Sequence, residues 1–460
     1  MMQHAKKAKQ FLSDEPRTDW HNRTLWMVRQ KRDRVAASVP GWEELREKAS
    51  RIKEEALSQL DAYLEQFETE AIKNGVKVLW ANDAGEFNQL MLSIIQDHKA
   101  KNIVKSKSML TEECGLNRFL HAQGIDVVDT DLGERIIQFR GEAPSHIVLP
   151  AIHLKKEEIG ETFHEKLGTE KGASDPLYLT RAARQHLRAK FLAADIAITG
   201  VNFAVAETGT VVVCTNEGNA DMGVHAAPIQ IHCMGIEKII PRSGDLGIFT
   251  RLLARSATGQ SVTTYTSHYR KPKPGGAMYV VIVDNGRSRH LSNPKYVNSL
   301  KCLRCGACMN TCPVYRRSGG HSYGYVIPGP IGSILAPQKN GKKYRDLPFA
   351  SSLCGSCSNV CPVKINIHEQ LYNWRQDITE QKLTSFIKRF SMKLTGFILA
   401  GNKTYNFAGR WVRRAIRYLP GKLLYLPVNA WGRGRELPVP PRQSFKEWYQ
   451  SNRKKTKDNE

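Results

Sequence analysis

Seven of the ten cysteines lie between residues 302 and 361, and their spacing constrains the chain more than any other feature of the sequence. The first group reads Cys302-Leu-Arg-Cys305-Gly-Ala-Cys308-Met-Asn-Thr-Cys312-Pro313. This C-x2-C-x2-C-x3-C-P run is typical of chains that wrap [4Fe-4S] clusters: three closely spaced thiolates bind one cluster, and the fourth cysteine binds the other cluster of a pair. One run of this kind therefore predicts two clusters.

The second group, Cys354-Gly-Ser-Cys357-Ser-Asn-Val-Cys361-Pro362, repeats the ending of the first and supplies the cross-ligand that the first group needs. We predict that cluster 1 is bound by four cysteines, which are Cys302, Cys305, Cys308 and Cys361. Cluster 2 would be bound by the remaining three, which are Cys312, Cys354 and Cys357. The fourth ligand of cluster 2 is expected three residues before Cys354, where the sequence has Ser351.

The serine at position 351 leaves the second ligand set incomplete. Because an alkoxide is a poor substitute for a thiolate, three alternatives are open: Ser351 binds cluster 2, a partner or small ligand completes it, or the cluster has a three-iron form. Pairs of the C-x2-C type also bind zinc, but the cross-shared pattern with a proline after each terminal cysteine favours iron-sulfur clusters. The metal-type spacing and the absence of a signal peptide argue against disulfides.

Apolar periodicity predicts an α/β region before the cysteine groups. Helical spacing from Trp42 to about Ile72 predicts one long amphipathic helix, which follows a highly charged N-terminal arm. Strands are expected at residues 76–80, 102–105, 125–128, 146–149, 229–233 and 278–283. Helices are expected near residues 84–99, 111–122, 155–166, 178–193 and 246–257. This alternation predicts βαβ units and a largely parallel sheet.

Four parts of the chain follow from these patterns. They are an N-terminal arm and long helix (1–72), an α/β domain (73–290), a two-cluster ferredoxin-type module (291–375) and a basic helical tail (376–460). The segment between the cysteine groups is rich in Gly, Pro and Tyr, and its length favours a mostly helical module over a compact β-rich ferredoxin. In the tail, amphipathic basic helices are expected at about 381–398 and 405–418, followed by the extended Leu437-Pro-Val-Pro-Pro441.

The net charge of +24 is concentrated in this tail, because residues 371–460 contain 19 Lys and Arg against 6 Asp and Glu. Such an excess predicts contact with an acidic partner or an anionic membrane surface, although a solvated basic face is the simpler alternative. The tail's aromatic residues have helical spacing, so we do not expect nucleic acid to bind. A polar N-terminus and the lack of a long apolar stretch predict a cytoplasmic location, or a peripheral position at the inner face of the membrane.

Candidate ligand-binding residues of the α/β domain lie in the segment 195–219, which reads as strand, turn, strand, turn. Polar groups at strand ends are where open α/β sheets bind ligands. The weak candidates are Glu207, Asn202, Thr208 and Asn219, together with Gly209, Asn216 and Glu217. The alternative is that they are turn residues that satisfy their own backbone. No G-x-G-x-x-G motif or P-loop is present, so neither NAD nor flavin is predicted as a cofactor.

Several segments together resemble the lactate utilization protein B family. They are Asn202-Phe-Ala-Val-Ala-Glu-Thr-Gly209, both cysteine groups with Pro362-Val-Lys-Ile365, Arg435-Glu-Leu-Pro438 and Ser444-Phe-Lys-Glu-Trp448. The resemblance implies a cytoplasmic iron-sulfur protein that works with two companion lactate utilization proteins to oxidise L-lactate to pyruvate. It implies that a serine at position 351 is normal, and that the α/β domain is similar in fold to the sugar-phosphate isomerase and CoA-transferase group. By that likeness Glu207 is a candidate nucleophile or general base.

Two functions remain in competition. Each cluster carries one electron, so two clusters can pass on a two-electron oxidation but cannot accept a hydride. In the first interpretation the chain is the electron-transfer component of a lactate-oxidising system. In the second it is a self-sufficient enzyme on a small organic acid or acyl substrate, with structural or regulatory clusters.

Overall fold

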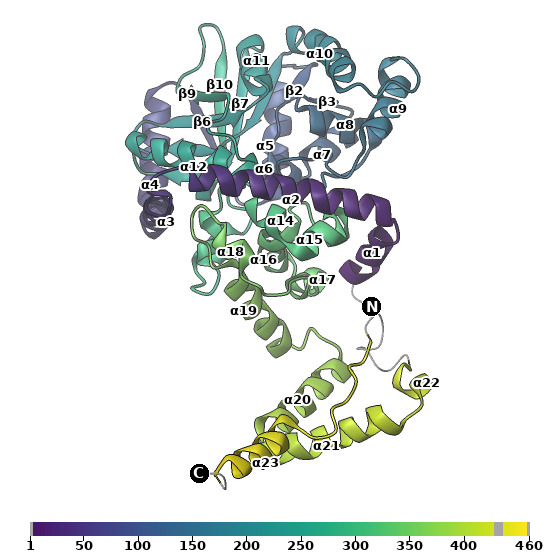
Figure 1. Ribbon diagram of the computed structural model, residues 1–460. Helices are drawn as coiled ribbons and strands as arrows, with labels where there is room; N and C mark the ends of the chain where they lie inside the picture. The colour runs from purple at the N-terminus through teal and green to yellow at the C-terminus, as the bar shows by residue number, and fades with distance from the viewer. Residues whose placement is uncertain (1–2, 427–435, 458–460) are drawn as a thin grey trace. The chain divides into compact units, whose positions relative to one another are not determined.

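The computed structural model describes residues 3–426 and 436–457. The chain divides into two compact units, Met1–Glu380 and Gln381–Glu460. The first unit contains the α/β layers and the cysteine-bearing module (Figure 1).

The first unit is built around a six-stranded sheet in which every neighbouring pair is parallel. The strands, in their order across the sheet, are β1 (Lys77–Ala81), β10 (Ala277–Val283), β7 (Ile229–Gly235), β4 (Ile196–Gly200), β2 (Ile103–Lys105) and β3 (Val127–Asp129). The largely parallel sheet expected from the sequence is therefore confirmed.

Helices bury both faces of this sheet, as a parallel sheet requires. Ile196 and Ile198 of β4 point into a core formed with helices α5 (Ala84–Asp97), α6 (Met109–Cys114) and α7 (Leu116–Ala122). Ala197, between them, points to the opposite core, which is formed with α10 (Pro176–Leu192) and α11 (Asn219–Ala226). Side-chain oxygens of Asp83 and Ser108 accept backbone N–H groups at the starts of α5 and α6, which fixes where these helices begin.

A second, mixed sheet of four strands packs into the same core as α10 and α11. Its strands, in order, are β8 (Ile239–Ile240), β5 (Phe203–Val205), β6 (Thr210–Thr215) and β9 (Tyr265–Tyr269). The β5–β6 hairpin is the strand, turn, strand expected within residues 195–219, and Ala204, Val211 and Val213 are its core residues.

The single long helix expected from Trp42 to Ile72 is two helices, α3 (Trp42–Ser58) and α4 (Leu60–Lys73). The chain breaks at Gln59, which has φ −131° and ψ 40°. The reason is packing: α3 contacts α12 (Leu246–Thr258), α4 contacts β1 and buries Phe67 in the sheet core, and both helices contact β8. One straight helix cannot cover both surfaces.

The strand expected at His146–Leu149 is wrong, because these residues form a loop packed against the cysteine-bearing module. His146 Nδ1 accepts the N–H groups of Val148 and Leu149, and its Nε2 bonds to Asn310 Oδ1 at 3.0 Å. The apolar run is therefore buried by the module and not by a neighbouring strand. Sequence periodicity also missed one short helix, α8 (Leu132–Arg140), and the separation of α6 from α7.

The cysteine-bearing module is helical, and within residues 291–380 the structure has no strand. Its helices are α14 (Ala307–Thr311), α15 (Pro313–Ser318), α16 (Gly329–Lys339), α17 (Gly341–Tyr344), α18 (Ser356–Asn359) and α19 (Ile367–Glu380). The charged N-terminal arm forms α1 (Gln3–Leu12) and α2 (Glu15–Ala37). Helix α2 runs across the unit and contacts both α12 of the α/β domain and α14 and α15 of the module (Figure 1).

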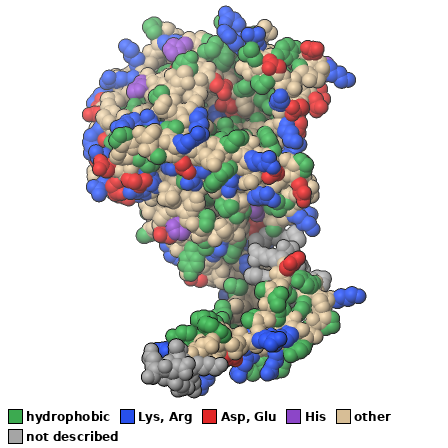
Figure 2. Space-filling model, viewed as in Figure 1, with side chains coloured by type: hydrophobic (Ala, Val, Ile, Leu, Met, Phe, Trp, Pro, Cys, Tyr) green, Lys and Arg blue, Asp and Glu red, His purple; other side chains and the backbone are tan. Residues whose placement is uncertain are grey.

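The second unit contains α20 (Phe386–Ala400), α21 (Asn402–Tyr418), α22 (Gly421–Leu424) and α23 (Phe445–Lys457). Helices α20 to α22 have no buried side chain, and Figure 2 shows hydrophobic and basic side chains beside one another on this unit. Residues 437–441 form neither helix nor strand, and Arg435 lies outside the described residues. In the part of the chain that is described, no helix combines the length and apolar character needed to span a bilayer.

Candidate iron-sulfur centre and adjoining pocket

The structure brings the four predicted ligands of cluster 1 around one cavity. Cys302, Cys305, Cys308 and Cys361 all line this small space. Three of the four are buried, and Cys302 is half-buried. The other walls are mainly apolar side chains, including Ile147, Ile331 and Val363.

The chemistry of these thiols fits a bound cationic group. Burial raises the pKa of the Cys305 thiol to about 12, and the neighbouring Cys361 and Cys302 thiols raise it as well. Burial likewise raises the pKa of Cys361 to about 11. Such thiols ionise at neutral pH only when a metal ion offsets the cost of burying the thiolate. Among the described residues no three His, Cys, Asp or Glu side chains are placed to hold one metal ion.

The three predicted cysteine ligands of cluster 2 are also neighbours. The pKa of the Cys357 thiol is raised to about 12, first by burial and then by the nearby Cys312 and Cys354 thiols. Cys312 and Cys357 are buried, whereas Cys354 is exposed. The second ligand set therefore reaches the surface of the protein at Cys354.

The two cysteine groups follow the same backbone course. In the first, Arg304 has φ +60° and its N–H donates to Cys302 Sγ at 3.4 Å. In the second, Leu353 has φ +55° and its N–H donates to Ser351 Oγ at 3.1 Å. In both, a glycine with φ +76° follows two residues later. Ser351 thus occupies, in its own turn, the position that Cys302 occupies in the first turn.

Arginines from the N-terminal helices hold the backbone beside the cysteines. Arg46 of α3 donates from Nε and Nη2 to the carbonyl of Cys361 at 3.0 and 2.8 Å, and from Nη2 to the carbonyl of Asn359 at 2.7 Å. Arg32 of α2 donates to the carbonyl of Val360 at 3.1 Å. Both arginines are buried, so they bring positive charge close to a set of thiolates. Sequence reasoning missed them, because their partners lie more than 300 residues further along the chain.

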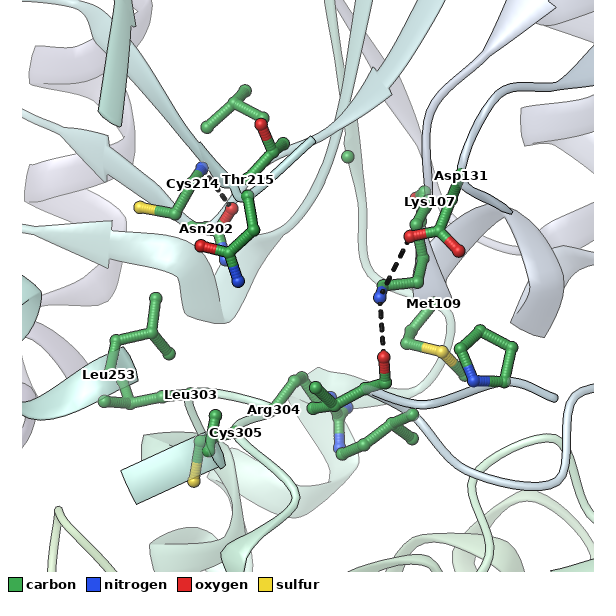
Figure 3. Close-up of a pocket in the computed structure, with 18 of the residues that line it drawn as sticks. Lys107, Met109, Asp131, Asn202, Cys214, Thr215, Leu253, Leu303, Arg304 and Cys305 are labelled. Carbon is green, nitrogen blue, oxygen red and sulfur yellow. Dashed lines mark hydrogen bonds and ion pairs between the residues drawn. The ribbon is translucent and has the colours of Figure 1, made fainter. Parts of the chain in front are cut away.

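A larger pocket of about 510 Å³ lies at the carboxyl ends of the parallel strands (Figure 3). The chain leaves β2 toward α6 on one face of the sheet, and leaves adjacent β4 toward the β5–β6 hairpin on the other face. Loops that diverge from neighbouring strands in this way open a crevice, which is where open α/β sheets bind ligands. Ser108 and Asn202, which follow these two strands, both line the pocket.

The pocket extends from the sheet to the cysteine-bearing module. Leu303, Arg304 and Cys305 form part of its wall, and Figure 3 shows them across the pocket from Asn202 and Thr215. Cys305 lines both this pocket and the cavity of the four cysteines. The crevice of the α/β domain therefore ends at a predicted ligand of cluster 1.

The structure separates the weak α/β candidates into two sets. Those at the open end of the β5–β6 hairpin line the pocket, and they are Asn202, Asn216, Glu217 and Asn219. Some of their hydrogen-bonding groups already have partners within the protein. Asn202 Oδ1 accepts from Cys214 N at 2.9 Å, and Asn219 Nδ2 donates to Thr130 Oγ1 at 3.2 Å.

The second set, Glu207, Thr208 and Gly209, forms the turn at the other end of the hairpin and does not line the pocket. Glu207 is exposed, and its carboxylate accepts the N–H of Ser243 at 2.8 Å, a hydrogen bond that lowers its pKa. A Cβ on Gly209 would lie 2.3 Å from the backbone nitrogen of Ala71. This turn packs against α4, which is the arrangement expected of turn residues that satisfy their own backbone.

Four basic residues line the pocket, and none of them was found from the sequence: besides Arg287 they are Lys107, Lys238 and Arg304. Lys107 donates to the carbonyl of Val148 at 2.9 Å and is paired with Asp131 at 3.4 Å (Figure 3). Lys238 and Arg304 line the part of the pocket near Cys305. They come from separate parts of the chain. The only sequence signal was that Lys107 and Lys238 follow closely after strands, and many residues that bind nothing have that position.

Matches to known families cover three successive parts of the chain. Residues 64–290 match a LUD domain, residues 298–365 a 4Fe-4S dicluster domain, and residues 375–454 the C-terminal region of lactate utilisation protein B. Lactate utilization protein B of Geobacillus thermodenitrificans is 43% identical over 438 residues, which cover 91% of this chain and 90% of that protein. The chain belongs to the lactate utilization protein B family.

Other relatives extend over the same length. Lactate utilization protein B of Macrococcus caseolyticus is 39% identical over 445 residues, covering 93% of this chain and 92% of that protein. An Escherichia coli relative, named uncharacterized electron transport protein YkgF, is 39% identical over 444 residues with the same coverage. Together with the dicluster match, these relatives make the chain an iron-sulfur protein of lactate utilization.

Among solved structures, a DUF162 family protein from Deinococcus radiodurans aligns with 49% of this chain and 98% of its own length. Its identity is 12% and its TM-score is 0.28, too low to support a statement about the fold. The likeness of the α/β domain to sugar-phosphate isomerases and CoA-transferases therefore stays a prediction.

Proposed function

We propose that this protein is the electron-transfer component of a multi-protein system that oxidises L-lactate to pyruvate. The observation that carries the proposal is the position of Cys305, which lines both the cysteine cavity and the pocket at the strand ends. A group bound in that pocket would lie beside the ligand set of cluster 1. Each cluster, when bound, accepts and releases one electron.

Two clusters are proposed, with the ligand assignment made from the cysteine spacing. Cys302, Cys305, Cys308 and Cys361 would hold cluster 1, next to the pocket. Cys312, Cys354 and Cys357 would hold cluster 2, which would be nearest the surface at the exposed Cys354. The arrangement supports electron flow from the pocket toward a partner that docks near Cys354.

Ser351 is proposed as the open position of cluster 2. The hydrogen bond from Leu353 N to Ser351 Oγ matches the one from Arg304 N to Cys302 Sγ, which supports a serine oxygen directed as a ligand would be. A neutral hydroxyl must lose its proton before it binds iron, so completion by a partner or small ligand remains the simpler alternative.

The basic tail is proposed to dock on an anionic membrane surface, where the electron acceptor would lie. Helix α21 is strongly amphipathic, with Arg410, Arg414 and Arg417 beside the exposed aromatic side chains of Phe407 and Trp411. A basic amphipathic helix with exposed aromatic side chains is typical of helices that lie in a membrane interface. Two companion lactate utilization proteins are the other proposed partners, and they would supply the chemistry that accepts the hydride equivalent.

The test is anaerobic reduction of the clusters by L-lactate, followed by absorbance and low-temperature EPR. We expect no reduction of the purified protein alone and reduction once both companion proteins are added. Reduction by L-lactate without them would favour the self-sufficient enzyme. Iron and sulfide quantitation on the same sample measures the number of clusters per chain, and fewer than two would contradict the assignment.

A further inference from the structure

Helix α3 contains a lysine in the position of a core residue. Lys53 is 3% exposed and lies in the buried stripe of α3 between Ala49 and Ala56, where an apolar side chain is usual. Its ammonium donates to the carbonyls of Glu237 at 2.5 Å and Ile239 at 3.0 Å. In the part of the chain that the structure describes, no ion pair joins Lys53 to a carboxylate. A buried ammonium is costly unless a negative charge offsets it, so the burial of Lys53 calls for a counter-charge nearby.

The charged groups around Lys53 do not balance. They comprise two carboxylates, Glu113 and Glu237, and four cations, which are Lys53, Lys238, Arg287 and Arg304. The Arg287 guanidinium pairs with both carboxylates, at 3.1 Å from Glu113 and 2.5 Å from Glu237. Glu237 attracts Lys53 from a greater distance, and its charge is shared among all four cations. This group of side chains therefore has two positive charges in excess before any cofactor is counted.

Lys53 lies beside the turn that carries Cys302. One helical turn before Lys53, Ser50 accepts a hydrogen bond from Nζ of Lys301 at 3.1 Å, and the next residue in the chain is Cys302. Side chains three residues apart lie on the same face of a helix. Burial lowers the pKa of Lys53 to about 7, whereas the Glu237 carboxylate and the Cys302 thiolate raise it. The missing negative charge is therefore available at the ligand set of cluster 1, where four thiolates outweigh the charge of an iron-sulfur core.

We propose that Lys53 is a buried counter-cation of cluster 1, whose charge stabilises the reduced cluster and so raises its reduction potential. The potential of an iron-sulfur cluster depends on the charge around it, and a fixed cation favours the form with one more electron. The buried arginines near the cysteines differ from Lys53 in this respect, because Arg32 is paired with Asp33 and Arg46 with Glu43. This role of Lys53 rests on the proposed function, since it requires cluster 1 at the four cysteines.

The test is an anaerobic, mediated redox titration of the purified, cluster-containing protein with dithionite, followed by low-temperature EPR. The signal of cluster 1 is the one lost in Cys302→Ser. Lys53→Gln removes the charge but keeps an N–H donor for the carbonyls. We expect it to lower the equilibrium constant for reduction of cluster 1 by about tenfold or more, equivalent to about 59 mV for one electron, and to affect cluster 2 less. Lys53→Arg keeps the charge and should keep the wild-type potential.

The exposed Lys48 of the same helix provides a matched control, because Lys48→Gln removes the same charge where water screens it and should leave both potentials unchanged. Lys238→Gln removes a half-buried charge without altering the two carbonyls, and it should lower the potential of cluster 1 by a smaller amount. It supplies a second measurement should Lys53→Gln not bind cluster 1, which iron and sulfide content would show. An unchanged potential in every neutral variant that retains cluster 1 would overturn the proposal and leave Lys53 as a structural hydrogen-bond donor. A shift that is larger at cluster 2 than at cluster 1 would overturn it as well.

These outcomes are separate from the test of the proposed function, because the titration uses neither L-lactate nor the companion proteins. A lowered potential in Lys53→Gln, in a protein that L-lactate and the companions never reduce, would contradict the proposed function and leave the role of Lys53 standing. Reduction of the wild-type protein by L-lactate, together with an unchanged potential in Lys53→Gln, would do the reverse.

Discussion

Replacing Gly209 with alanine tests whether the turn Glu207–Gly209 is a structural contact or a binding site. Gly209 has φ +65°, which costs a residue with a Cβ about 1–2 kcal/mol. Its Cβ would also lie 2.3 Å from Ala71 N and 2.7 Å from Ala71 Cα, both backbone atoms of α4 that cannot move aside as a flexible side chain can. Overpacking of this kind typically costs about 1–3 kcal/mol more.

The combined destabilisation expected for Gly209→Ala is about 2–5 kcal/mol. Unfolding entropy scales with chain length at about 2.1 cal/mol/K per residue, so in the unit Met1–Glu380 each kcal/mol lowers Tm by about 1.2 °C. Gly209→Ala should therefore lower Tm by about 3–6 °C. The assay is thermal unfolding followed by circular dichroism at one fixed scan rate, because loss of clusters makes unfolding irreversible.

Two further glycines separate the two contributions. Gly124 has φ +74° with no atom within 4 Å of its Cβ position, so Gly124→Ala measures the backbone cost alone, about 1–2.5 °C in Tm. Gly247, in the first turn of α12, also has open space and no positive φ, and Gly247→Ala should raise Tm slightly, since alanine has a higher helix propensity than glycine. A Gly209→Ala protein that unfolds no earlier than Gly124→Ala would refute the packing of this turn against α4. Loss of lactate-dependent reduction at unchanged Tm would make the turn a functional site.

Three other predictions follow from the cysteine module and the tail. Cys302→Ser and Cys361→Ser should remove the same EPR signal although they lie in different cysteine groups, and loss of different signals would show that the groups are paired wrongly. Ser351→Ala should leave the iron content unchanged if a partner or small ligand completes cluster 2, whereas a three-iron signal in this variant would show that Ser351 is a ligand. Ser351→Cys should alter the spectrum of cluster 2 only. Deletion of residues 381–460 should keep both cluster signals but abolish binding to anionic vesicles, and binding by the full chain should weaken as salt rises, since screening acts over about 8 Å at physiological ionic strength. Vesicle binding that is insensitive to salt, or that survives the deletion, would show that the tail does not dock on the membrane surface through its charge.

Local patterns in the sequence were sufficient to predict the elements whose structure depends on neighbouring residues. The apolar runs of β4, β7 and β10 alternate between two buried faces, and the regular spacing of helices between them required a parallel sheet. The cysteine spacing similarly identified the cysteine-bearing module. These features depend on neighbouring residues, which a sequence displays directly.

Features that depend on distant partners were not predictable in the same way. Residues 146–149 have the apolar composition of a strand, but they are buried by the module around Asn310, and no local signal distinguishes the two environments. Arg304 and Lys238 come together only because the turn that carries Cys305 closes over the strand ends. The break at Gln59 has the same origin, since two separate surfaces compete for one amphipathic segment.

The position of α2 has a consequence for how the protein is made. His21 bonds to the carbonyl of Arg316, and Arg32 to that of Val360, across 295 and 328 residues of sequence. At a synthesis rate of about 5–20 residues per second, the first helices to leave the ribosome wait about 15–70 s for these partners. The chain's earliest segment therefore cannot complete its packing until residues 316 and 360 have been made. A chain that ends before residue 359 would contain Arg32 and Arg46 but would lack the backbone carbonyls to which they donate.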